Sequence, residues 1–200
     1  MANEDIHKSS QPSWISVDDG AHDETLVETW LFRLRRERFR SRTSGKTHDF
    51  YVTDVADGVH AIAVTLDQKV VMVRQFRAGA RRDCLETPGG LLDPGEDPCV
   101  AGARELLEET GYQGDPPEFL CTLRPNPALL SMQISTILVR NVQRVADPHL
   151  DPGEELTLEL VDVYDIPKLI KSGQIDHGVC VAGLLWWLER DRLDETSPSS

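Results

Sequence analysis

The pattern of apolar and polar positions predicts short strands in the first half of the chain. Apolar and polar residues alternate imperfectly over Thr25–Phe39, a turn cluster follows at residues 40–45, and a second such segment covers His48–Val55. Alternation with a period of two is typical of strands that bury one face, so we expect two or three antiparallel strands here. A further strand pair is predicted at His60–Leu66 and Val70–Val73.

The second half of the chain mixes strands with helices. Strands are expected at Ile134–Val142 and Leu156–Val163, a short helix at Ile166–Lys171 before Gly173, and an amphipathic helix at Val179–Arg192. The inward face of the last helix is predicted to carry Ala182, Leu185, Trp186 and Leu188. Because strands and helices interleave without a regular βαβ repeat, we expect an α/β or α+β fold with a mixed sheet between helices.

The clearest helix is predicted at Pro98–Thr110, after a loop at Leu91–Glu96. Asp97 suits the N-cap, because its carboxylate can accept from the first free backbone N–H groups, and Pro98 suits the first helical position. Gly111 suits the left-handed position that ends a helix.

One face of this helix is unusually acidic. At about 100° per residue, Glu105, Glu108 and Glu109 share an arc of about 100°. The opposite face carries Val100, Ala103, Leu106 and Leu107. Like charges four residues apart destabilise a helix, by about 0.2–0.5 kcal/mol per pair. A solvated face tolerates this cost, but the preceding loop brings Glu96 and Gly90 in front of the same helix. Oxygen ligands without cysteine or histidine suit Mg2+ or Mn2+.

Composition narrows the possible partners. The 200 residues carry 21 Lys and Arg against 34 Asp and Glu, a net charge of −13. This excess argues against binding to nucleic acid or to an anionic membrane, because no basic surplus exists to displace phosphate counterions. A phosphate-bearing substrate stays open, since divalent metals screen acidic residues locally. The six histidines show no ligand spacing and are expected to be uninvolved.

The ends and the cysteines suggest a cytoplasmic protein. The first ten residues have no apolar core of the secretory kind, and the four cysteines show no CxxC spacing and are expected to be reduced thiols. We expect a disordered arm at residues 1–13, N-terminal strands at 14–55 as a candidate dimerisation element, the main domain at 56–194, and a flexible tail at 195–200.

The acidic helix and its loop carry a known pattern. The spacing G-x5-E-x7-R-E-U-x-E-E-x-G-U, with U a bulky apolar residue, is met at Gly90, Glu96, Arg104, Glu105, Leu106, Glu108, Glu109, Gly111 and Tyr112. This is the Nudix box, so the sequence resembles the Nudix hydrolase superfamily. The lead-in Leu85–Gly90, Pro127 and the acidic stretch Gly153–Leu156 are similar to the ADP-ribose and nucleotide-sugar pyrophosphatase branch.

The resemblance implies an α/β fold: a Nudix α/β/α sandwich with a mixed sheet, plus small N-terminal antiparallel strands. It implies Mg2+-dependent hydrolysis of the diphosphate bond of ADP-ribose or a related nucleotide sugar, with Mn2+ as a substitute. It also implies a homodimer. Other substrates stay open, among them nucleoside triphosphates, dinucleoside polyphosphates and NADH. A non-catalytic nucleotide-sugar sensor is a further alternative, although such domains often lose box glutamates that this chain keeps.

The resemblance also assigns roles to single residues. The metal ligands would be the carbonyl of Gly89 with Glu105, Glu109 and Glu154, and the catalytic residues would be Glu108, Glu109 and Glu155. Substrate contacts are expected from Arg74, Arg77 and Glu86, and supporting roles from Glu96 and Arg104.

The general base is the one role that the resemblance leaves open. The family position falls on Pro152, which cannot accept a proton. Glu155, Asp151 and the box glutamates are the alternatives.

Overall fold

The computed structural model describes residues 11–17, 24–150 and 153–196. Most of the predicted arm, most of the predicted tail, and the base position with Asp151 lie outside these residues. The chain divides into two compact units. One contains residues 1–55 with 126–131, and the other contains residues 56–125 with 132–200. Each unit is described by itself.

The first unit is an antiparallel sheet. It contains β1 (Trp14–Ser16), β2 (Glu24–Glu28), β3 (Phe32–Ser41) and β4 (Thr47–Val55). Strand β3 pairs with β4 along one edge and with β1 and β2 along the other. This confirms the strands predicted from the alternation between Thr25 and Val55. Ion pairs such as Arg33–Asp54, at 2.8 Å, link β3 to β4.

The second unit is built on an eight-stranded mixed sheet. Its strands are β5 (Gly58–Thr65), β6 (Lys69–Arg77), β7 (Arg82–Glu86), β8 (Gly89–Leu91), β9 (Tyr112–Gln113), β10 (Glu118–Leu123), β11 (Ile134–Arg144) and β12 (Leu156–Asp162). The central order is β10-β11-β5-β6-β12. Only the β11–β5 pair is parallel, and the other pairs between described strands are antiparallel.

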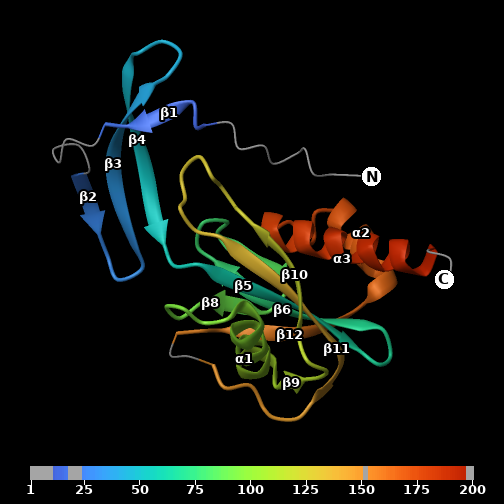
Figure 1. The fold of residues 1–200 in the computed structure, drawn as a ribbon. Coiled ribbons are helices and arrows are strands. Elements are labelled where there is room, and N and C mark those ends of the chain that lie inside the picture. Colours follow the sequence, from blue (N-terminus) through green and yellow to red (C-terminus); the bar gives the residue numbers. More distant parts are fainter. Residues whose placement is uncertain (1–10, 18–23, 151–152, 197–200) are drawn as a thin grey trace. The chain divides into compact units, whose positions relative to one another are not determined.

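Helices cover both faces of this sheet (Figure 1). Helix α1 (Pro98–Thr110) packs on the face that carries Val59 and Ala61. A short 3-10 turn (Val163–Asp165), α2 (Ile166–Lys171) and α3 (Gly178–Thr196) follow β12, and both helices pack on the face that carries Ile62 and Met72. Successive residues of β5 thus point to opposite layers, which gives the predicted α/β/α sandwich.

Both long helices are rotated about their axes relative to the prediction, so they bury a different set of residues. On α3, Leu185 and Trp186 are 47% and 52% exposed, while Leu184 and Trp187 are buried. On α1, Val100 is 60% exposed, whereas Glu109 is only 4% exposed. Helix α1 buries this other face because Gly102 lets it approach the sheet closely. A Cβ at that glycine would lie 2.5 Å from Ile137 Cδ1.

The local signals for α1 are confirmed. Asp97 Oδ1 accepts from the backbone N–H groups of Cys99 and Val100, at 2.8 and 3.3 Å. Gly111 ends the helix at φ 73°. Leu91, by contrast, completes β8 instead of opening the predicted loop. Among the described helices, none combines the length and apolarity of a membrane span.

Candidate active site

Strand β8 lies directly against the acidic helix at Gly89 and Gly90. The backbone N–H of Gly89 donates to Glu109 Oε2 at 2.9 Å. At Gly90, a Cβ would lie 2.5 Å from Glu105 Oε1, so any larger residue would displace that carboxylate. The spacing of the motif therefore has a direct steric reason. The contact is made by the backbone of β8 and by carboxylates of the helix.

Burial makes these carboxylates hard to ionise in the absence of a cation. Burial raises the pKa of Glu109 to about 7, and the negative charges of Glu105 and Glu154 act in the same direction. The hydrogen bond from Gly89 opposes this rise, since it favours the charged form. Burial also raises the pKa of Glu105. A divalent cation among these groups would relieve both the desolvation and the mutual repulsion.

The late loop contributes to the same group of charges. The charge of Glu154 raises the pKa of both Glu105 and Glu109, so the structure brings this loop residue near the helix. Glu155 is exposed on the same loop. Every donor gathered here is an oxygen, which fits a hard cation such as Mg2+ or Mn2+.

Arg104 holds three glutamates at once. Its Nη2 lies 3.1 Å from Glu96 Oε2, and its Nη1 lies 2.8 Å from Glu105 Oε1 and 3.0 Å from Glu108 Oε2. Glu96 Oε2 also accepts from the backbone N–H of Asp93 at 3.0 Å, so it braces the loop against the helix. The ion pair with Glu96 is the main cause that raises the pKa of Arg104, so the guanidinium stays charged. Glu108 is itself exposed at the edge of the group.

Arg77 and Glu86 form a second ion pair on the same side of the sheet. Glu86 is fully buried, and its Oε2 lies 2.7 Å from Arg77 Nη2. Glu86 is paired in register with Val73, so both side chains point to the layer that contains α1. Glu86 is thus committed to orienting the Arg77 guanidinium, whose side chain is partly exposed.

Arg74 does not join this group. It lies on the opposite face of β6, where Leu85 is its partner in register and belongs to the apolar cluster under α3. There its Nη2 lies 3.2 Å from Glu159 Oε2 on β12. The sequence did not reveal this pairing, because the two residues are 85 positions apart. The alternation along β6 separates Arg74 from Arg77.

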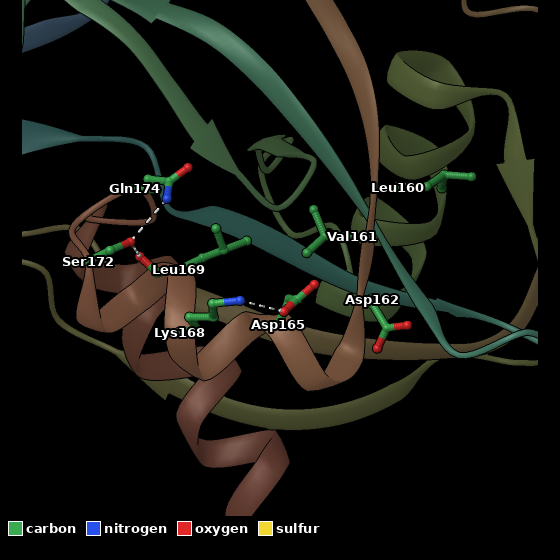
Figure 2. A pocket seen from close by; sticks show the side chains of 8 residues that line it. All are labelled: Leu160, Val161, Asp162, Asp165, Lys168, Leu169, Ser172 and Gln174. Carbon is green, nitrogen blue, oxygen red and sulfur yellow. Dashed lines mark hydrogen bonds and ion pairs between the residues drawn. The ribbon is translucent and has the colours of Figure 1, made fainter.

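A pocket lies away from these residues. Leu160, Val161 and Asp162 at the end of β12 form one wall (Figure 2). The turn and helix that follow provide the rest, namely Asp165, Lys168, Leu169, Ser172 and Gln174. Figure 2 shows Lys168 paired with Asp165, and Gln174 hydrogen-bonded to Ser172. None of the predicted site residues lines this pocket.

Comparison with known proteins gives a consistent family. Residues 56–181 match the NUDIX domain family. A methanol dehydrogenase activator from Bacillus methanolicus is 33% identical over 133 residues, or 66% of this chain and 72% of that protein. An ADP-ribose pyrophosphatase from Bacillus subtilis is 30% identical over 148 residues, or 66% and 80%.

Two further comparisons extend over more of the chain. An ADP-ribose pyrophosphatase from Mycobacterium tuberculosis is 29% identical over 167 residues, or 81% of this chain and 79% of that protein. A crystal structure of an ADP compounds hydrolase superposes with a TM-score of 0.78 at 19% identity, and the match covers 96% of this chain and 100% of that one. At this sequence identity, the structural similarity shows the fold alone.

Proposed function

This chain belongs to the Nudix family, and from that premise we propose that it hydrolyses the diphosphate bond of ADP-ribose or a related nucleotide sugar. The products would be a nucleoside monophosphate and a sugar phosphate. The observation that carries the proposal is the group of the buried Glu109 with the half-buried Glu105 and Glu154, whose mutual repulsion suits a bound cation. The relatives named ADP-ribose pyrophosphatase support the substrate class.

We assign the metal to the oxygen donors of this group. Glu105, Glu109 and Glu154 with the carbonyl of Gly89 would hold Mg2+, for which Mn2+ could substitute. When bound, such an ion neutralises diphosphate charge and lowers the pKa of a coordinated water. The chain's own side chains would position these ligands and the substrate.

Positioning is the main contribution of the surrounding residues. Arg104 fixes Glu105 and Glu108 relative to the loop through its contact with Glu96. Gly89 fixes Glu109 through its backbone N–H. Arg77, oriented by the fully buried Glu86, would contact a substrate phosphate. Phosphoryl transfer depends mostly on such positioning and on charge stabilisation. The role predicted for Arg74 in substrate binding stays a prediction.

The proton acceptor is assigned to a glutamate at the exposed edge of the site. Glu155 and Glu108 are both exposed and so open to the water that attacks the diphosphate, and Glu109 is the buried alternative. A general base of this kind contributes about 10²–10⁴-fold to the rate.

A panel of diphosphates tests the function. The substrates would be ADP-ribose, ADP-glucose, GDP-mannose, NADH, diadenosine polyphosphates and nucleoside triphosphates, each with Mg2+ and with Mn2+. We expect ADP-ribose or an ADP-sugar to be preferred, and Glu109→Gln to abolish turnover. Glu189→Gln, on the exposed surface of α3, is the matched control and should keep activity. Turnover of triphosphates or dinucleotides alone would overturn the substrate assignment, and tight binding without turnover would favour the sensor alternative.

We further propose a cytoplasmic homodimer that uses the N-terminal strands. Four apolar residues at and after β2 are exposed: Leu26, Val27, Leu31 and Trp30, the last at 93%. An exposed apolar patch of this kind is typical of an interface. The four free cysteines support a reducing compartment. Light scattering on the full chain should give twice the monomer mass, and Trp30→Ser should shift it toward the monomer. A monomeric wild-type chain would refute the dimer.

A further inference from the structure

Two histidines and a cysteine meet inside the second unit, on the sheet face opposite α1. His60 comes from β5, His177 immediately precedes α3, and Cys180 lies in the first turn of α3. Their donor atoms all lie within 4.8 Å of one another. His60 and Cys180 are buried, and His177 is half-buried.

The two separations from the sulfur are close to those of a tetrahedral metal site. With bonds of about 2.0–2.1 Å to nitrogen and about 2.3 Å to sulfur, two ligands of such a site lie about 3.3–3.6 Å apart. Cys180 Sγ lies 3.2 Å from His177 Nδ1 and 3.5 Å from His60 Nδ1. The ligand atoms of the two histidines lie within 4.8 Å of each other, so they would have to move closer together around one ion.

The chemistry of the three side chains also suits a transition metal. A neutral imidazole and a deprotonated thiol are the forms that bind such ions, and the cluster contains two imidazoles and one thiol. Thr87 Oγ1 donates to Cys180 Sγ at 3.3 Å, and this bond can persist when the sulfur binds a metal.

One contact competes with metal binding. His60 Nδ1 lies 3.0 Å from Thr87 Oγ1 and 3.3 Å from the Thr87 carbonyl oxygen. A hydrogen-bonded network without metal would satisfy His60 in this way. Among the described residues, these three side chains have no buried polar atom without a hydrogen-bond partner, so an ion would replace existing hydrogen bonds.

We propose that His60, His177 and Cys180 bind one divalent transition-metal ion of the Zn2+ type. A thiolate with two imidazoles selects such an ion over Mg2+, so this site is chemically distinct from the carboxylate group on α1. Three protein ligands leave one coordination position for water. The ion would join α3 to β5 at the residue whose partner in register is Gly89, and would stabilise the segment that presents Gly89 to Glu109. This inference does not rest on the proposed substrate.

Cobalt spectroscopy on the full, reduced and chelator-treated chain tests the site directly. Co2+ bound to a thiolate gives a charge-transfer band and a tetrahedral visible spectrum, which an all-oxygen site does not give. We expect one equivalent of Co2+ to produce both features, and Zn2+ to displace it. Glu109→Gln should keep the spectrum, because it alters only the carboxylate site. Cys121→Ser is the matched control for a buried cysteine elsewhere and should keep it too.

Two ligand variants decide the outcome. Cys180→Ser should lose the thiolate band, because it removes the sulfur. Both Cys180→Ser and His177→Asn should weaken Co2+ affinity by more than about 100-fold, since even outer partners of a metal ligand cost 10–100-fold. Zn2+ should raise the melting temperature of the wild type but not of these variants. If Cys180→Ser fails to fold by circular dichroism, the Co2+ affinity of His177→Asn, at its half-buried position, gives the answer. Absence of the band in the wild type, its persistence in folded Cys180→Ser, or an unchanged Co2+ affinity in His177→Asn would overturn the proposal.

Discussion

The backbone N–H of Gly89 donates to Glu109 Oε2 at 2.9 Å, which ties strand β8 to the last turn of α1. The carboxylate is held by this bond while it is almost entirely buried. Burying a charged carboxylate lowers the free energy of unfolding, and a bound cation would offset this loss.

The stability of the metal-free protein should fall as pH rises. The pKa of Glu109 is raised from 4.5 to about 7, so the folded state holds this proton more tightly than the unfolded state. The proton's stabilising effect is complete below about pH 4.5 and is lost as pH rises through about 7, at up to about 1.4 kcal/mol per pH unit. Urea unfolding in EDTA between about pH 5 and about pH 8 measures this slope. Glu109→Gln should flatten it, and equal slopes in both proteins would contradict the assignment.

Gly90→Ala should damage the metal site while the fold persists. The new Cβ would lie 2.5 Å from Glu105 Oε1, so the carboxylate must move away from its neighbours. We expect the Mg2+ concentration for half-maximal activity to rise at least about tenfold, in the range found when partners of metal ligands are disturbed. Gly79→Ala is the control, because its Cβ would meet nothing within 4 Å. Equal metal dependence in the two variants would refute the steric role of Gly90.

Arg104→Lys should weaken metal binding although it preserves the charge. A lysine offers one compact ammonium group, whereas the guanidinium reaches Glu96, Glu105 and Glu108 together. We expect a 10–100-fold loss of Mn2+ affinity, measured by titration calorimetry. Arg144→Lys, at an exposed pair with Asp147, should leave the affinity unchanged. Unchanged affinity in Arg104→Lys would show that the clamp is dispensable.

The pH dependence of kcat should identify the general base. Replacing it by glutamine removes the group whose deprotonation is required, so kcat should fall by about 10²–10⁴-fold and its acidic limb should disappear. Glu155→Gln and Glu108→Gln are compared across the same pH range at saturating Mg2+. Retention of the acidic limb and of kcat in a variant eliminates that residue as the base.

Local features of this protein can be predicted from the order of its amino acids alone. Asp97 and Gly111 specify the ends of α1, because caps act through neighbouring backbone groups. The spacing from Gly90 to Glu109 specifies which residues meet at the loop and helix, since they are close in the chain. Alternation predicted the strands between Thr25 and Val55 for the same reason. Short strands such as β7 and β10 escaped prediction, because their few residues show little periodicity.

The surroundings of each side chain, in contrast, depend on how the elements pack together. Helical periodicity orders residues around an axis but does not say which side packs on the sheet. The burial of Glu109 and the exposure of Val100 therefore could not be predicted from periodicity. The alternation along β6 places Arg77 with the acidic helix and Arg74 with Glu159, a distinction made by strand pairing. His60 and Cys180 meet across 120 positions of sequence. Contacts of that range arise from packing, which local patterns of residues do not encode.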